Sequence, residues 1–257
     1  MALPSSGQIT FNQVNVELDN TATAQVGLND SAVRGLFGKS SGQISMSDGY
    51  GKSTVPTVIA SGTGKNNFGA TVNSGDVAIF YNGRMTRPPS PSSGMVLPSG
   101  FTMVDTVNAS VQWNTGDPNW YEGVICGYKL MGGGETSFQG DASLSNGAWS
   151  IIRMPGGAMS SLSHFGTVVS TNRNVHINFS ATSNLNTLRL VGSGGYNAGS
   201  TFGGIPSGAV VLVNSLRGPR ATMGAAFYNS AYTSGTGFQI FGGGFKKAAI
   251  GFSLQGS

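Results

Sequence analysis

Glycine occupies 41 of the 257 positions, and this frequency restricts the fold more than any other feature of the chain. It is more than double the usual share of about 7%. A glycine inside a helix costs roughly 1 kcal/mol relative to alanine, so long helices are disfavoured. Glycine also reaches positive φ without steric strain, which suits tight turns between short strands. We therefore expect a mainly β fold.

The chain is also poor in charge. Charged residues make up 9% of it, against about 25% in an average protein, so uncharged polar side chains or neighbouring subunits have to cover its surface. On this ground we expect a symmetric homo-oligomer, a trimer or a ring. The net charge is +4, but the basic residues are scattered as isolated pairs, which disfavours nucleic-acid binding.

Cysteine usage and apolar patterning exclude further classes. Cys126 is the only cysteine, so an intrachain disulfide and a cysteine-based zinc site are impossible, and the alternation around it predicts a buried thiol. No stretch approaches the roughly 20 apolar residues of a membrane span, and the first residues lack the features of a signal peptide. We expect no metal, no cofactor and no membrane insertion, and synthesis in the cytoplasm.

The first 54 residues differ from the rest and contain a repeat. Ser5–Phe11 reads Ser-Ser-Gly-Gln-Ile-Thr-Phe, and Ser40–Met46 reads Ser-Ser-Gly-Gln-Ile-Ser-Met. Each copy combines a glycine turn, an apolar position and a helix start signal. Thr10 and Gln13 have the spacing of a capping box, which predicts a short helix after Thr10.

A second short helix is predicted in the same segment, with Asn29 or Asp30 to cap it and Gly38 to end it. The segment has too few apolar residues to bury much surface alone, so we expect it to dock onto its own large domain or onto another protein. We predict an attachment module, residues 1–54, and a β domain, residues 55–257. The residues expected to carry the attachment are Ile9, Val14, Leu18, Val33, Leu36 and Ile44.

Residues 55–257 have the pattern of short strands separated by turns. Apolar and polar residues alternate in Val175–Ala181 and in Ala248–Leu254, as in strands with one buried face. Further strands are expected at 77–81, 101–107, 124–130, 149–154, 188–191, 209–216, 225–228 and 238–241. About ten short strands without a clear helix predict a two-sheet β-sandwich of jelly-roll type.

An aromatic segment in this domain is the best candidate for ligand contact. Trp113, Trp120 and Tyr121 flank a turn-rich run that contains Asp117. Flat rings beside Asn and Asp suit stacking against sugars together with hydrogen bonding. The same residues equally suit a loop that folds back over an open end of the sandwich.

Catalytic patterns are sparse, and we expect no enzyme. His176 lies on the polar face of a predicted strand and His164 in a Ser-rich loop, without a metal-binding or triad pattern around either. A glycosidase needs two carboxyl groups about 5–10 Å apart. Glu122 and Glu135 could approach each other if the strands flanking the glycine turn at 132–134 were paired. Otherwise both are polar residues of loops and sheet edges.

The first 53 residues contain a series of short sequence motifs. In chain order they are Leu3–Ile9, Gln13–Leu18, Ala22–Gln25, Leu28–Arg34, Ser41–Asp48 and Tyr50–Ser53. In this order they resemble the N-terminal module of virion structural proteins of tailed bacteriophages, which are often tail or fibre components. The chain departs from that pattern at Asp19, where glycine is expected, and at Gly49, where a larger residue is usual.

The larger domain also contains short motifs that resemble a β-sandwich of phage tail and fibre proteins. They are Gly75–Ile79, Leu97–Thr102, Tyr128–Lys129, Glu135–Thr136 and Trp149–Arg153. The resemblance implies a non-enzymatic minor structural protein of a virion. The module would anchor it to other virion proteins, and the sandwich would contact a host-surface glycan or receptor, or a neighbouring subunit. A capsid decoration or cementing protein and a polysaccharide depolymerase remain alternatives.

Overall fold

A computed structural model of the chain describes most of its length. The described residues are 3–18, 20–54, 56–64, 67–86, 95–111, 120–139, 147–155, 159–170, 175–178, 187–196, 201–204, 209–217, 220–228, 237–241 and 247–256. Two α-helices, one 3₁₀ helix and thirteen strands lie in these residues. The fold is therefore mainly β, as the glycine content predicts.

Each copy of the N-terminal repeat begins a short helix. Helix α1 (Phe11–Glu17) starts at the predicted capping box, in which Thr10 Oγ1 accepts the Gln13 N–H at 3.3 Å and Gln13 Oε1 accepts the Thr10 N–H at 2.8 Å. The second copy leads into the 3₁₀ helix η1 (Met46–Gly49). The glycines of the two copies, Gly7 and Gly42, have φ values of 86° and 79°, which explains why the repeat requires glycine there.

Helix α2 (Ser31–Phe37) lies between the two copies of the repeat. It ends at Gly38, which has a φ of 69°, the left-handed conformation that glycine adopts at helix ends. Asp30 occupies the N-cap position, but its carboxylate accepts the N–H of Gly27 at 2.8 Å instead of a helix N–H. The predicted bounds of this helix are confirmed, and the predicted capping bond is absent.

Two five-stranded antiparallel sheets form the body of the molecule. The first has the order β1-β5-β2-β4-β3 and the second the order β10-β11-β8-β13-β6. The first consists of β1 (Thr57–Thr63), β2 (Val77–Thr86), β3 (Thr102–Val111), β4 (Trp120–Leu130) and β5 (Gly147–Arg153). The second consists of β6 (Met159–Ser170), β8 (Thr187–Tyr196), β10 (Ala209–Arg217), β11 (Arg220–Tyr228) and β13 (Lys247–Gly256).

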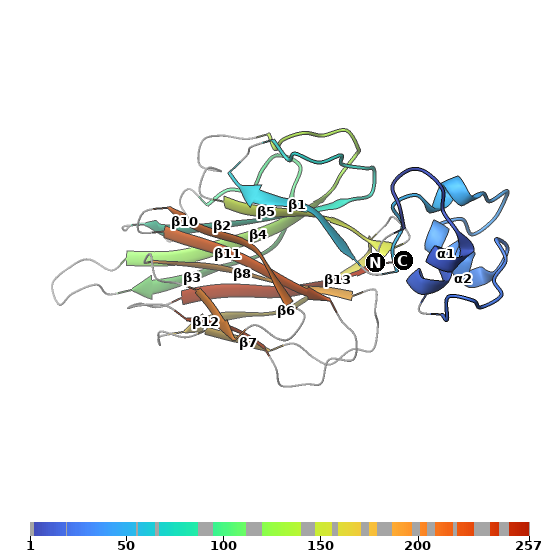
Figure 1. The fold of residues 1–257 in the computed structure, drawn as a ribbon. Coiled ribbons are helices and arrows are strands. Elements are labelled where there is room, and N and C mark those ends of the chain that lie inside the picture. Colours follow the sequence, from blue (N-terminus) through green and yellow to red (C-terminus); the bar gives the residue numbers. More distant parts are fainter. Residues whose placement is uncertain are drawn as a thin grey trace.

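A third, smaller sheet has the order β7-β12-β9. Its strands are β7 (Val175–Asn178), β9 (Thr201–Gly204) and β12 (Gly237–Phe241). Strand β7 contacts β6 and β13 of the second five-stranded sheet. The small sheet therefore adds a layer beside the second sheet, which Figure 1 shows below it.

The main core lies between the two large sheets. Strands of the first sheet contact strands of the second along its whole width, from β1 against β10 to β3 against β6. Ile79 of β2 and Cys126 of β4 are fully buried there beside Ile250 and Leu254 of β13. Burial raises the pKa of the Cys126 thiol well above its ordinary value. The prediction of a buried thiol is confirmed.

A second core covers the outer face of the first sheet. Phe80 and Trp149 point to that face and pack against Phe68 and Phe138, which lie in segments between strands. The ring centroids of Phe68 and Phe138 are 4.6 Å apart, and those of Phe68 and Trp149 are 5.0 Å apart, both edge to face. Such pairs stabilise by about 0.5–1.5 kcal/mol beyond their buried area. The first sheet is therefore buried on both faces.

Every strand expected from the sequence coincides with a strand of the structure, but three strands were not expected: β1, β6 and β9. Strand β6 corrects the placement of His164, which pairs with Phe252 of β13 instead of lying in a loop. The serines of this segment hide the strand in the sequence, because its pairing with β13 decides its conformation and not its own β propensity.

The module lies at one end of the body (Figure 1). Strand β1 starts at that end, and the chain finishes there after β13 (Figure 1). Because β2 and β5 are antiparallel, with Val77 opposite Ile152, β2 starts where β5 ends. The body therefore has an end next to the module and an opposite, distal end.

Candidate functional site

The structure places the six predicted attachment residues inside the module. Val14 and Val33 are fully buried and Ile9 and Leu36 nearly so, whereas Leu18 and Ile44 are half-buried against the same core. Leu3 and Phe37 complete the buried set. The buried members of this set hold the module together, so a contact surface of the module has to include residues that are more exposed.

Exposed apolar side chains of the module are the better candidates for contact with another protein. Phe11 is 41% exposed and Val16 is 52% exposed, both on α1, and Tyr50 is 40% exposed. The Tyr50 hydroxyl donates to the Gly7 carbonyl at 2.5 Å, which ties the ring to the first copy of the repeat. Nothing in the sequence pattern separated these residues from the core positions, because in so short a helix apolar side chains occur on both faces.

A buried glutamate closes the module where the chain leaves it. Glu17 is 4% exposed at the end of α1. Its Oε1 accepts the Ser53 hydroxyl at 2.7 Å and the Thr54 N–H at 2.9 Å, and its backbone carbonyl accepts the Thr54 hydroxyl at 2.9 Å. The boundary expected at residue 54 is therefore tied back to the first helix, and Ser53 has a structural role.

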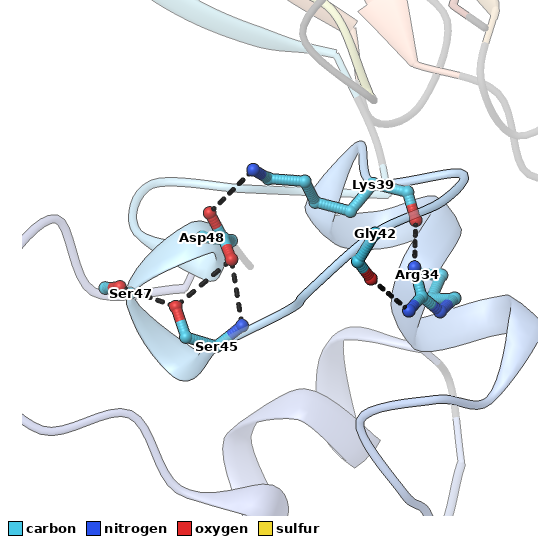
Figure 2. Close-up of polar contacts among 6 residues, drawn as sticks. All are labelled: Arg34, Lys39, Gly42, Ser45, Ser47 and Asp48. Carbon is cyan, nitrogen blue, oxygen red and sulfur yellow. Dashed lines mark hydrogen bonds and ion pairs between the residues drawn. The ribbon is translucent and has the colours of Figure 1, made fainter.

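Two charged side chains organise the second copy of the repeat (Figure 2). Arg34 donates to the carbonyls of Lys39 and Gly42 at 2.9 and 2.7 Å, and so ties α2 to the glycine turn. Asp48 accepts the Ser45 N–H at 2.8 Å and lies 3.4 Å from the Lys39 ammonium. The Ser45 N–H, more than the Lys39 charge, lowers the pKa of Asp48.

Gly49 explains one departure from the virion-protein pattern. A Cβ atom at Gly49 would lie 2.6 Å from the ring of Phe37, and Phe37 is 2% exposed in the module core. A larger residue would therefore have to displace Phe37. The glycine is matched to this particular packing. The other departure, Asp19, lies outside the described residues.

The aromatic positions predicted to contact a ligand lie at the distal end of the body. Trp120 and Tyr121 begin β4, where they pair with Val111 of β3 and Thr86 of β2. Lys129, at the other end of the same strand, is nine residues further, about 30 Å at 3.3 Å per residue. Trp113 and Asp117 lie outside the described residues.

Strands of the second sheet bring further residues to the distal end. Because β13 finishes near the module (Figure 1) and pairs antiparallel with β8, Tyr196 at the end of β8 is distal. Arg220 of β11 pairs with Tyr196 and also with Arg217 of β10. In the sequence the two arginines are one of the isolated basic pairs. The Gly-Pro dipeptide between them is a signal that could have placed them at a hairpin tip.

A polar pocket of about 250 Å³ lies at the end of β4 that is nearer the module. Its lining includes Ser99, Lys129, Glu135 and Gln139. Glu135 accepts the N–H groups of Gly132 and Gly133 at 2.9 and 2.7 Å. Burial acts to raise the pKa of Glu135, but these hydrogen bonds and the Lys129 ammonium 3.6 Å away outweigh it and lower the pKa.

The two carboxylates considered for glycoside hydrolysis do not meet. Glu122 pairs with Met85 and Ala109 near the start of β4, whereas Glu135 follows the end of that strand. Strand β4 pairs with β2 and β3, not across the glycine turn that follows it. Their backbones are therefore separated by about 25 Å or more along the strand, well beyond the roughly 5–10 Å of a glycosidase pair.

Among the described residues, no three His, Cys, Asp or Glu side chains cluster as metal ligands. Within the same part of the chain, no helix is long and apolar enough to cross a bilayer. Comparisons with protein-family models, curated proteins and solved structures found no match to the chain.

Proposed function

We propose that the chain is a non-enzymatic structural protein of a tailed-phage virion, in which the N-terminal module attaches to other virion proteins. The body then carries a second contact surface, at its distal end, for a host-surface glycan or receptor. The proposal rests on one arrangement. A module with its own core lies at one end of the body, and the predicted aromatic ligand positions lie at the other.

The separate cores support an attachment role for the module. The module core and the two body cores share no residue, so the module can fold around its own apolar side chains and still present Phe11 and Val16 outward. Exposed aromatic and aliphatic side chains of this kind are the anchors of protein contacts.

The distal positions support a ligand role for the body. Trp120, Tyr121 and Tyr196 are aromatic residues at this end of their strands, and Arg217 and Arg220 are basic residues at the same end. Aromatic rings stack on sugar faces, and guanidinium groups donate hydrogen bonds to sugar hydroxyls and carboxylates. An acidic or neutral surface polysaccharide fits this chemistry.

We interpret the two facing sheets as a β-sandwich, because their strands contact each other in matching order. The jelly-roll description has less support. The first five strands all lie in one sheet, whereas the Greek-key arrangement of a jelly roll distributes successive strands between two sheets.

Incorporation into particles tests the attachment. Removing residues 1–54 is expected to leave a folded body that no longer enters particles. The sharper variant is Phe11→Ser with Val16→Ser, because both side chains are exposed and the module core is untouched. The matched control is Met103→Ser with Leu130→Ser, which changes two equally exposed apolar side chains of the body. Incorporation that survives the first pair, or is lost with the control pair, contradicts the proposal.

Binding to host cells tests the distal surface. Particles carrying Trp120→Ala, Tyr121→Ala or Arg220→Ala are expected to assemble normally and to adsorb at least about fivefold less to cells, since a stacked ring or guanidinium contributes about 1–3 kcal/mol. Normal adsorption with every variant would contradict host binding by the distal end and would favour a decoration or cementing role. Polysaccharide cleavage that vanishes with Glu122→Gln or Glu135→Gln would establish a depolymerase instead.

A further inference from the structure

The two large sheets have the same internal strand order. The first is formed by the five strands of residues 57–153, and the second by β6, β8, β10, β11 and β13 of residues 159–256. When the five strands of each half are numbered from one to five along the chain, both sheets read 1-5-2-4-3. All neighbours in both are antiparallel.

The contacts between the sheets are symmetric under exchange of the halves. The first strand of one half contacts the third strand of the other in both directions, as β1 against β10 and β3 against β6. Three further pairs of contacts are reciprocal in the same way. Strand β5 contacts β10 as β13 contacts β3, and β5 contacts β11 as β13 contacts β4. Strand β2 contacts β11 as β8 contacts β4. The second strands, β2 and β8, contact each other. A two-fold axis between β2 and β8 produces this set of pairs.

The segments between the strands repeat the same layering. In the second half, β7 lies in the connection between strands one and two, β9 in that between two and three, and β12 in that between four and five. In the small sheet β12 lies between β7 and β9, so the third of these connections is flanked by the first two. In the first half, Thr136 accepts the N–H of Phe68 at 2.8 Å and Gln139 accepts that of Ser99 at 2.9 Å. These bonds join the same three connections in the same order.

Two short words of sequence recur at these places. Leu97-Pro98-Ser99-Gly100 precedes the third strand of the first half, and Ile205-Pro206-Ser207-Gly208 precedes that of the second. Thr136-Ser137-Phe138-Gln139 and Thr236-Gly237-Phe238-Gln239 lie between strands four and five. In the first half the two words are bonded to each other through Ser99 and Gln139. In the second, Gln239 pairs with Gly204, the residue before Ile205.

We infer that residues 57–153 and 159–256 are two copies of one folding unit, and that the inner face of each sheet is a self-complementary surface whose partner is the second copy. Strand order, reciprocal contacts, layering and the recurring words agree independently. The body is thus the intramolecular form of a two-fold dimer, and its two halves are exchangeable in the chain.

Exchangeability makes a geometric prediction. Five residues, 154–158, join the end of β5 to the start of β6. Under the two-fold axis, the distance from the end of β13 to the start of β1 is equivalent to the distance from the end of β5 to the start of β6. The same five residues should therefore be long enough to join β13 to β1. Figure 1 is consistent with this, since the C-terminal end and the start of β1 lie at the same end of the body.

A rearranged full-length chain tests the inference. Its segments run 1–56, 159–256, 154–158, 57–153 and 257, so the module precedes β6 and the natural linker joins β13 to β1. We expect a monomer or oligomer of the natural size, an unchanged far-ultraviolet spectrum and one cooperative body transition within about 5 °C of the natural chain. A rearranged chain that does not fold overturns the exchange of the halves.

A distance in the natural chain order provides the second measurement. Spin labels on Thr57→Cys and Gly256→Cys should lie within about 30 Å, the reach of six residue steps plus the two label arms. Cys126 is fully buried and will not take a label. A longer separation overturns the two-fold relation, whatever the rearranged chain does. A short separation together with a folded rearranged chain supports it.

Discussion

In the module, side chains that bond to each other are mostly close in sequence. Thr10 and Gln13 are three residues apart, as are Ser45 and Asp48, and Arg34 reaches Lys39 across five. In the body, by contrast, the Arg153 guanidinium binds the buried Asp76 carboxylate across 77 residues, with bonds of 2.9 and 2.8 Å.

This difference indicates how each region folds. We expect local capping bonds to define the module's turns first. Bonds of Glu17 and Tyr50, and backbone bonds from Leu3 to Lys52 and from Gly51 to Pro4, then join its ends. The body needs strands from distant parts of the chain to pair first, which is slow because loop closure precedes the gain from contacts. We therefore expect the two regions to unfold as separate units, and four sets of substitutions test this from the largest effect to the smallest.

Loss of a core ring should give the largest effect and should remain in its own region. Trp149→Ala removes a 1% exposed indole that packs on Phe68 and Phe138, and should lower the free energy of unfolding of the body by about 3–5 kcal/mol. Phe37→Ala is the counterpart in the module. Calorimetry should show two transitions, each moved by one substitution only. A common shift of both would mean that the regions unfold together.

Loss of the hydrogen bonds that Glu17 accepts from Ser53 and Thr54 should give the next largest effect. Glu17→Ala leaves the Ser53 hydroxyl and the Thr54 N–H without this acceptor, which costs roughly 1.5–3 kcal/mol for bonds to a charged group. Hydrogen exchange should rise throughout the module and stay unchanged in β2 and β4. Glu17→Gln keeps one acceptor oxygen and should recover part of the protection. Equal loss with both variants would show that the charge, not the bond geometry, matters.

A pair of glycines compares the tolerance of the two cores. A Cβ atom at Gly49 in the module and one at Gly62 in the body would each lie 2.6 Å from a buried aromatic ring, of Phe37 and Trp149 respectively. Overpacking of this kind costs about 1–3 kcal/mol. The module core has six buried side chains and the core around Trp149 has eight, so the smaller core can adjust and Gly49→Ala should be the milder change in urea unfolding. A larger effect in the module would reverse this view of the two cores.

Acid should affect the module through Asp48 and the body through Glu135, with the smallest effects. Both pKa values are lowered in the folded protein, so each carboxylate stabilises above its unfolded pKa and loses that contribution as pH falls through the folded value. Below about pH 4, the free energy of unfolding of the module should fall less steeply with pH in Asp48→Asn than in the natural chain, and that of the body should be unchanged. Glu135→Gln should have the corresponding effect on the body alone. Unfolding curves from pH 2 to 7 measure both slopes. Identical slopes in natural and variant chains would exclude these contributions.

Much of the module could be predicted from sequence because its signals are local. The repeated Ser-Ser-Gly-Gln-Ile word gave both positive-φ glycines, and the Thr10–Gln13 spacing gave the first helix. The role of its apolar residues could not be predicted in the same way. Ile9 and Val14 are buried and Phe11 and Val16 are exposed, and in a seven-residue helix periodicity alone does not decide which face becomes the core.

In the body, alternation of apolar and polar residues determined where most strands lie, since one buried face requires that period. It did not determine which strands pair. The Ser-rich β6 became a strand only through β13, and Glu122 and Glu135 separated because β4 paired with β2 and β3. Only the tertiary structure decided the strand order common to both halves. That order depends on pairing between strands that are distant in the chain, and the two short motifs that recur in both halves are too local to specify it.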